Sequence, residues 1–259
     1  MPDTGNKRIE LDFDGHTALI RINRPEKLNA LDYDMVLALE RAAILADNEA
    51  GIRAVIITGT GEKSFCAGGD IESWSSWAPE DFALKWVRQG HRAFDALARL
   101  RQPLIATLNG HCLGGGLEVA ITADLRVAEE HVKLGLPETG LGIIPGWSGT
   151  QRATRRFGAQ LVRRMALAGE VFDAPTSLSL GLVDRVAPRG TGLEVAKTIA
   201  AQIAGRSPSA TRLTKLLINA AEGEEREAAM EAMGGFIAAD SADLAKGLEA
   251  FRNKRKPEF

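Results

Sequence analysis

The chain has few cysteines, few aromatic residues, almost no net charge and no long hydrophobic run. Two cysteines and four histidines occur in 259 residues, and their spacing fits no metal site. So few cysteines favour a reducing compartment over a disulfide-stabilised fold. A net charge of -2 gives no general attraction to nucleic acid. Because no stretch of about 18 apolar residues is present, we expect no membrane span.

The composition is otherwise typical of a soluble globular protein. Hydrophobic residues make up 45% and charged residues 25% of the chain, which are ordinary values. Residues 1–10 are polar and lack the apolar centre of a signal peptide, so we expect a cytoplasmic protein.

Hydrophobic patterning predicts strands and helices that alternate, followed by helices alone. Alternation over 8–13 and 17–22 predicts a β-hairpin, and short apolar runs at 54–58 and 103–108 predict buried strands. Favourable helix starts follow at two places, Asp32 as an N-cap and Pro79 as a first helical residue.

From Gly192 onward nearly the whole chain has helical periodicity. Together with the alternating first part, this predicts an α/β core at residues 1–195, which holds the site. A helical region at residues 196–259 follows it.

Two glutamates stand in glycine-rich segments near the middle of the chain. Residues 109–118 read NGHCLGGGLE and end in Glu118, and residues 136–146 read LPETGLGIIPG and contain Glu138. Three consecutive glycines expose the backbone where we expect a helix to begin. The first amides of a helix are unpaired and lie at the positive end of its dipole. They can therefore stabilise an oxyanion within reach of Glu118.

Each of these features also has a structural interpretation. Glu118 and Glu138 could be ordinary acids at helix starts, and Asp70 could be a loop cap. Glycines between a strand and a helix also bind dinucleotides, but neither segment has the G-x-G-x-x-G spacing which that function needs. We interpret Cys66 and Cys112 as packing residues. His111 adjoins Cys112 in the sequence, but neighbouring side chains generally point apart, so we expect no base in position to activate a thiol.

Six segments in this order resemble the crotonase family, also called the enoyl-CoA hydratase/isomerase superfamily. They read NRP with NAL at 23–31, FCAGGDI at 65–71, the two glutamate segments, GTQR at 149–152, GLVD at 181–184 and AFRNKR at 250–255. The resemblance covers almost the whole chain.

The resemblance implies an α/β fold, a crotonase-like spiral of ββα units with a helical C-terminal trimerisation region. It also implies a homotrimer or a hexamer built as a dimer of trimers. The substrate would be an acyl-CoA thioester, so coenzyme A would be part of the substrate and no separate cofactor or metal is expected. Neither nucleic acid nor a membrane is expected as a partner.

Single positions follow from the same resemblance. Ala67 and Gly115 match the residues whose N–H groups form the oxyanion hole, and Glu118 and Glu138 match the catalytic pair of the hydratases.

Coenzyme A would contact two parts of the chain. One part consists of Lys27 and the loop formed by Gly69, Asp70 and Ile71. The other is the tail, with Phe251 and Lys254.

Several aromatic residues follow the 69–71 loop. Trp74 and Trp77 lie beside Phe82 and Trp86 in the sequence, and Trp147 follows the second glycine-rich segment. Core packing is the simplest interpretation of such residues. Their position also makes Trp74, Trp77 and Trp147 candidates for the wall of an acyl pocket.

Two carboxyl groups suit hydration of an α,β-unsaturated thioester, because one can act as base and the other as acid. An isomerase that moves a β,γ double bond to the α,β position needs only the carboxylate at Glu138. Dehalogenases, decarboxylases and hydrolases of this family keep other residues at these sites. A non-catalytic or RNA-binding member is disfavoured by the presence of both glutamates. The sequence therefore predicts an enoyl-CoA hydratase, with an isomerase as the alternative.

Overall fold

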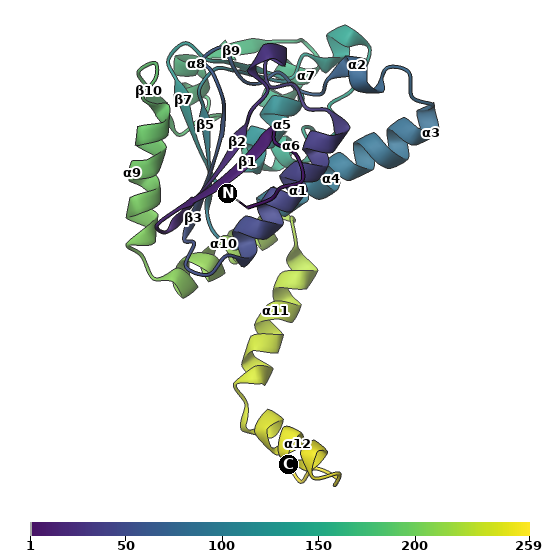
Figure 1. Ribbon diagram of the computed structural model, residues 1–259, viewed down its shortest axis with the longest axis vertical. Coiled ribbons are helices and arrows are strands. Elements are labelled where there is room, and N and C mark those ends of the chain that lie inside the picture. Colours follow the sequence, from purple (N-terminus) through teal and green to yellow (C-terminus); the bar gives the residue numbers. More distant parts are fainter. Residues whose placement is uncertain (1) are drawn as a thin grey trace. The chain divides into compact units, whose positions relative to one another are not determined.

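The computed structural model describes residues 2–259 and contains two β-sheets with helices around them (Figure 1). The larger sheet has the order β1-β2-β3-β5-β7-β10. Its strands are β1 (Ile9–Asp14), β2 (Thr17–Ile22), β3 (Ala54–Gly59), β5 (Leu104–Leu108), β7 (Leu125–Glu129) and β10 (Arg185–Ala187). Only the β1–β2 hairpin is antiparallel within this sheet. The predicted hairpin and the two predicted buried strands are confirmed.

The smaller sheet has four short strands in the order β4-β6-β8-β9. They are β4 (Ser64–Cys66), β6 (His111–Leu113), β8 (Lys133–Gly135) and β9 (Val171–Asp173). The first three pair in parallel, and β9 pairs with β8 in antiparallel fashion.

Successive segments place one strand in each sheet. β3 is followed by β4, β5 by β6 and β7 by β8, and a helical segment follows each of these pairs. The chain therefore winds through both sheets in turn, which confirms the expected spiral of ββα units. β4, β6 and β8 are parallel neighbours in the smaller sheet. The loops that follow these three strands therefore leave the same edge of the sheet and lie near one another.

Both faces of the larger sheet are buried. Along β3, Ala54 and Ile56 pack in one core with helix α9 (Gly192–Ala204), whereas Val55 and Ile57 pack in the main core on the other side. This alternation follows from the two-residue period of a strand. It also explains why the sequence of β3 is apolar without interruption.

The helices of the first part of the chain are mostly short. They are α1 (Tyr33–Asn48), α2 (Ile71–Trp74), α3 (Pro79–Asp81), α4 (Arg88–Ala98), α5 (Gly115–Thr122), α6 (Gln151–Phe157), α7 (Ala159–Ala166) and α8 (Ala174–Ser179). Asp32 caps α1 as predicted, because its carboxylate accepts the N–H of Met35 at 3.0 Å. The helix predicted to begin at Pro79 does so as α3, and it continues through a π-helical turn, η2 (Phe82–Val87), into α4.

The C-terminal part is helical, as predicted. After α9 come α10 (Pro208–Glu222), α11 (Arg226–Ala239) and α12 (Ala242–Arg252). One compact unit ends at Lys215, and a second comprises Leu216–Phe259. The division at residue 195, which separates a site-bearing core from an oligomerisation region, stays a prediction. Within residues 2–259, every helix is too short or too polar to cross a bilayer.

The second unit exposes large apolar side chains. Met230, Phe236 and Ile237 on α11 and Phe251 on α12 are each at least 70% exposed. Isolated apolar residues are common on protein surfaces, but several of them on neighbouring short helices indicate a binding face.

Candidate active site

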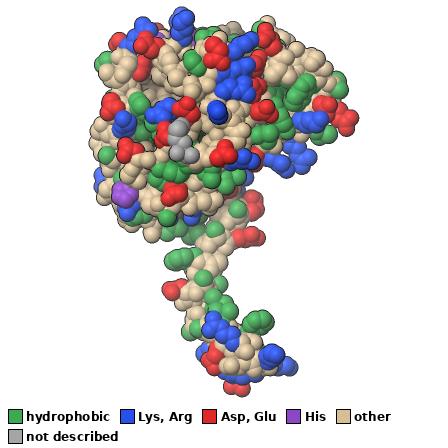
Figure 2. All heavy atoms as spheres, viewed as in Figure 1, with side chains coloured by type: hydrophobic (Ala, Val, Ile, Leu, Met, Phe, Trp, Pro, Cys, Tyr) green, Lys and Arg blue, Asp and Glu red, His purple; other side chains and the backbone are tan. Residues whose placement is uncertain are grey.

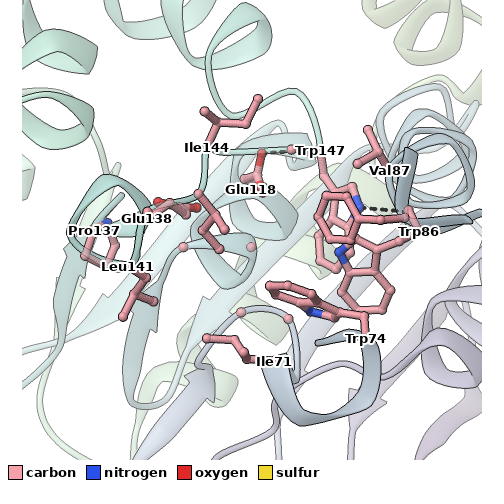
Figure 3. Close-up of a pocket in the computed structure, with 18 of the residues that line it drawn as sticks. Ile71, Trp74, Trp86, Val87, Glu118, Pro137, Glu138, Leu141, Ile144 and Trp147 are labelled. Atoms are coloured by element: carbon pink, nitrogen blue, oxygen red, sulfur yellow. Dashed lines mark hydrogen bonds between the residues drawn. The ribbon is translucent and has the colours of Figure 1, made fainter. Parts of the chain in front are cut away.

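A cavity of about 370 Å³ lies where the loops after β4, β6 and β8 meet (Figure 3). Its walls come from residues 67–69, helix α2, the π-helical turn η2, the start of α5 and the segment 137–147. The volume falls in the usual range for a small-molecule site, about 300–1,000 Å³.

Glu118 lies on the first turn of α5 and is only 3% exposed. Its Oε1 atom accepts two backbone N–H groups, from Trp147 and from Gly149, each at 2.7 Å. Ser148 between them has φ 74°, a left-handed conformation. A Cβ atom on Gly149 would lie 2.6 Å from the same oxygen, so this position requires glycine. The carboxylate of Glu118 is therefore held in one orientation.

Glu138 is the first residue of a short 3₁₀ helix, η3 (Glu138–Leu141), and is 6% exposed. Within residues 2–259, no other residue donates a hydrogen bond to its carboxylate oxygens, although its own backbone N–H lies close enough to lower its pKa slightly. The side chain lies against the start of α5, because a Cβ atom on Gly114 would be 3.2 Å from Oε1 of Glu138. A buried carboxylate without a partner is costly in a fold. Such a group is therefore a strong candidate for a functional role.

Both carboxyl groups bind protons more tightly than an ordinary glutamate. Burial raises the pKa of Glu118 to about 8, and the negative charge of Glu138 adds to this effect, against the N–H bonds and Arg152. Burial also raises the pKa of Glu138 to about 7. Near neutral pH the pair can therefore both accept and release a proton.

Two backbone amides at the cavity are available to a ligand. Gly115 begins α5, and within residues 2–259 its N–H has no acceptor. The same holds for the N–H of Gly69, which also lines the cavity. The two glycine loops touch, because a Cβ atom on Gly68 would lie 3.1 Å from the nitrogen of Gly115. Two such donors side by side can bind one oxyanion.

The predicted role of Ala67 needs correction. Its N–H donates to the carbonyl of Leu28 at 3.1 Å, so this donor is already used within the protein. The available amide in this loop is that of Gly69, two residues further on.

Asn29 holds the loop after β2 in place. It is fully buried, and its amide nitrogen donates to the carbonyls of Ser64 at 2.8 Å and Thr60 at 3.0 Å. Its amide oxygen accepts the N–H of Arg24 at 2.9 Å. Asn29 thereby ties this loop to the start of β4. Asn29 belongs to one of the six segments that resemble the family, but the sequence did not predict that it would tie these two parts of the chain together.

The residues predicted to contact coenzyme A lie in different surroundings. Lys27 reaches Glu72 of α2, with Nζ 2.6 Å from the carboxylate, so its segment adjoins the 69–71 loop. Gly69 and Ile71 line the cavity, whereas Asp70 pairs with Arg24 at 2.8 Å and does not line it. This ion pair supports a structural role for Asp70.

The other predicted contacts to coenzyme A lie in the tail. Phe251 and Lys254 belong to the second compact unit, and their role stays a prediction.

The predicted pocket tryptophans separate into two groups. Trp74 and Trp147 line the cavity. Trp77 does not, because its ring packs against Tyr33 at 5.6 Å and Trp86 at 6.4 Å between centroids. Trp77 therefore supports the wall from behind.

The two cysteines are fully buried and free, and they lie opposite each other on the neighbouring strands β4 and β6. Burial raises the pKa of Cys66 to about 12 and that of Cys112 well above its usual value. Both thiols are therefore unreactive packing residues, as expected. No cluster of metal-ligating side chains occurs in the described part of the chain.

Comparison with known proteins agrees with this architecture. A sequence model described as enoyl-CoA hydratase/isomerase matches residues 12–259. A short-chain-enoyl-CoA hydratase of Clostridium acetobutylicum is 35% identical over 254 residues, which is 96% of each chain. A crotonyl-CoA hydratase of Syntrophomonas wolfei is 34% identical over 255 residues, which is 98% of each chain. The crystal structure of an enoyl-CoA hydratase from Bacillus anthracis aligns with a TM-score of 0.80 and 34% identity, over 98% of this chain and 99% of that one.

Proposed function

The chain belongs to the enoyl-CoA hydratase/isomerase family, and from this premise we propose that it adds water across the α,β double bond of an enoyl-CoA thioester. One observation carries the proposal: a buried glutamate on the first turn of α5, Glu118, and a second that lies against Gly114 just before α5, Glu138, line one cavity with two available amides. Water addition requires a polarised carbonyl, a base and an acid, and these groups can supply all three.

The amides of Gly69 and Gly115 would bind the thioester oxygen. As water attacks carbon 3, negative charge moves onto this oxygen and an enolate develops. Donors fixed by the fold stabilise this charge as it forms and need no reorganisation at that moment.

The two glutamates would then handle the protons. Glu118 is fixed by two N–H groups, so it can aim a water and accept its proton as the oxygen bonds to carbon 3. Glu138 has no competing partner and can deliver a proton to carbon 2. Overall, one water molecule is added to one double bond. Glu118 takes up one proton and Glu138 releases one, so the two glutamates together gain and lose none.

Double-bond isomerisation is the second candidate. It needs a single carboxyl group that removes a proton from carbon 2 and returns one to carbon 4, so that the double bond moves from carbons 3 and 4 to carbons 2 and 3. The unpartnered carboxyl group of Glu138 suits such a shuttle. Glu118 has no necessary part in that reaction, and its fixed orientation favours hydration.

A direct assay tests both candidates. The purified protein is mixed with crotonyl-CoA, with longer enoyl-CoA thioesters and with a β,γ-enoyl-CoA. Hydration removes the absorbance of the conjugated thioester, and isomerisation creates it. Absence of hydration with all the α,β substrates would overturn the proposal.

We expect a bell-shaped dependence of kcat/KM on pH. Both glutamates have a pKa raised above the usual 4.5, to about 7 and about 8. Because the charge of one carboxyl group affects the other, these values belong to the pair. The pair carries two protons below about pH 7 and lacks a base, shares one proton between about pH 7 and pH 8, and carries none above about pH 8 and lacks an acid. Initial rates of crotonyl-CoA hydration between pH 5 and pH 10 measure this. A flat profile across that range would contradict the two-glutamate mechanism.

We also propose that the protein assembles as a trimer or a pair of trimers through its C-terminal helices. The exposed apolar side chains of α11 and α12 support this, because a face of this kind is normally covered. Removal of residues 241–259 is expected to weaken assembly and coenzyme A binding while residues 2–215 stay folded. Light scattering and circular dichroism measure the two effects, and a fully active monomer would contradict the proposal.

A further inference from the structure

All four tryptophans of the chain lie in one cluster beside the cavity, and Figure 3 shows three of them, Trp74, Trp86 and Trp147. Trp86 is at its centre, with its ring centroid 4.7 Å from that of Trp147, 6.2 Å from that of Trp74 and 6.4 Å from that of Trp77. Phe82 extends the cluster, 4.9 Å from Trp74. Aromatic residues are only 5% of the chain, so their concentration at one wall of this cavity is a specific local feature.

The π-helical turn η2 builds part of this wall. In a π-helix each N–H pairs with a carbonyl five residues earlier, so Phe82 and Val87 lie one turn apart with Trp86 beside them. All three line the cavity. In a regular α-helix Phe82 and Val87 would point about 140° apart, and fewer large side chains would face the cavity.

Two glycines allow the indole rings to approach the reacting centre. A Cβ atom on Gly69 would lie 2.7 Å from Cζ2 of Trp86, and one on Gly115 would lie 2.8 Å from Cζ3 of Trp147. These are the glycines whose amides would bind the thioester oxygen. The indole rings therefore lie next to the amides that would bind the thioester oxygen, and the acyl carbons near this oxygen would lie close to the aromatic wall.

The wall is rigid. Nε1 of Trp147 donates to the carbonyl of Trp86 at 3.2 Å, and a Cβ atom on Gly90 would lie 1.9 Å from this nitrogen. Trp147 also packs edge to face against Phe94 at 5.0 Å. A rigid aromatic surface is already organised for a ligand and loses little freedom when one binds.

The opposite wall is aliphatic and uncharged. Leu141, Ile143 and Ile144 line that side, and the two glutamates are the only lining residues with a charged side chain. Figure 3 shows the indole rings of Trp74, Trp86 and Trp147 together on one side of the cavity, with Leu141 and Ile144 away from them. An acyl group with a charged substituent would therefore find no counter-charge here.

We infer that the acyl group bound by this site carries a neutral aromatic ring on carbon 3, as in a cinnamoyl-type thioester. The thioester part of this inference rests on the proposed function. Aromatic rings attract one another in tilted or offset geometry at centroid distances of about 4.5–7 Å. A ring on carbon 3 would continue the array that Trp74, Trp86 and Trp147 already form. A saturated ring of the same size would bury similar area without this attraction.

Two unreactive ligands separate these contributions. 3-Phenylpropanoyl-CoA and 3-cyclohexylpropanoyl-CoA differ only in the aromaticity of the ring, and neither has a double bond to hydrate. Titration calorimetry gives both affinities, and tryptophan fluorescence checks them because every tryptophan is in this cluster. We expect the phenyl ligand to bind about 3- to 10-fold more tightly. Equal or tighter binding of the cyclohexyl ligand by the unmodified protein would overturn the inference.

A matched pair of variants locates the effect. Trp74→Leu removes a ring that lines the cavity, whereas Trp77→Leu removes a ring of the same cluster that does not line it. The preference for the phenyl ligand should fall in Trp74→Leu and persist in Trp77→Leu, with circular dichroism as the folding check. The reverse pattern would overturn the inference.

Failure of the proposed hydration can be distinguished from failure of this inference. Ligand binding needs no catalysis, and crotonyl-CoA needs no aromatic wall. A protein that prefers the phenyl ligand but hydrates no enoyl-CoA would support the aromatic site and overturn the proposed reaction. A protein that hydrates crotonyl-CoA but prefers the cyclohexyl ligand would support the proposed reaction and overturn the aromatic site.

Discussion

Replacement of Glu118 by glutamine is expected to lower the hydration rate by about 10²- to 10⁴-fold, the usual contribution of a positioned acid or base. Glutamine has nearly the same shape, and its amide oxygen can still accept the N–H groups of Trp147 and Gly149. The fold and acyl-CoA binding should therefore be retained. What is lost is the ability to accept a proton from water. Stopped assays with crotonyl-CoA, together with a binding titration, separate these effects.

Glu138→Gln is the matched change on the other side of the site. It should lower hydration by a similar factor and should also abolish any double-bond shift, because the proton shuttle is assigned to this carboxyl group. Isomerase activity should survive better in Glu118→Gln than in Glu138→Gln. Equal loss of both activities in both variants would show that this division of roles is wrong. Near-normal hydration in either variant would remove that glutamate from the mechanism.

The second large effect concerns the backbone of Gly115. Gly115→Pro deletes the N–H donor, and proline is tolerated at the first position of a helix such as α5. Loss of one oxyanion donor typically lowers kcat by about 10²- to 10³-fold. The matched control is Gly115→Ala, which keeps the N–H but adds the same Cβ atom. That atom would crowd Trp147 at 2.8 Å in both variants, so the difference between them isolates the donor.

Circular dichroism and melting temperature are needed alongside this comparison, because both variants must move the Trp147 ring. If folded Gly115→Pro is as active as Gly115→Ala, the oxyanion is bound elsewhere. The same pair of changes at Gly69 tests the second donor, where the added atom would meet Trp86 at 2.7 Å.

Regular elements were predictable wherever the sequence has a period or a capping signal. The hairpin at β1 and β2, the buried strands β3 and β5 and the cap of α1 by Asp32 all follow from local chemistry. The smaller sheet did not follow from periodicity, because β4, β6 and β8 have three residues each. Three residues carry no period, and their pairing is set by distant parts of the chain. The resemblance to a known family supplied the spiral that links both sheets.

The site was predictable in its residue types but not in its hydrogen bonds. The glycine-rich segments correctly indicated Glu118, Glu138 and Gly115 as neighbours in one cavity. The donor in the other loop was placed at Ala67, whose amide the structure pairs with Leu28. Which of several successive amides is left unpaired depends on contacts between segments far apart in the sequence. Local sequence patterns do not contain that information.

The fit of Trp147 over Gly90 has an evolutionary consequence. A glycine inside α4 lowers helix stability by about 1 kcal/mol relative to alanine, yet any larger residue would displace an indole ring whose own backbone N–H holds Glu118. Selection on the site should therefore keep glycine at position 90, although this residue touches no substrate. Among relatives, alanine at this position should occur together with a smaller residue at position 147. The two positions should therefore change as a pair during the divergence of the family, and an alignment of relatives in which they vary independently would contradict this.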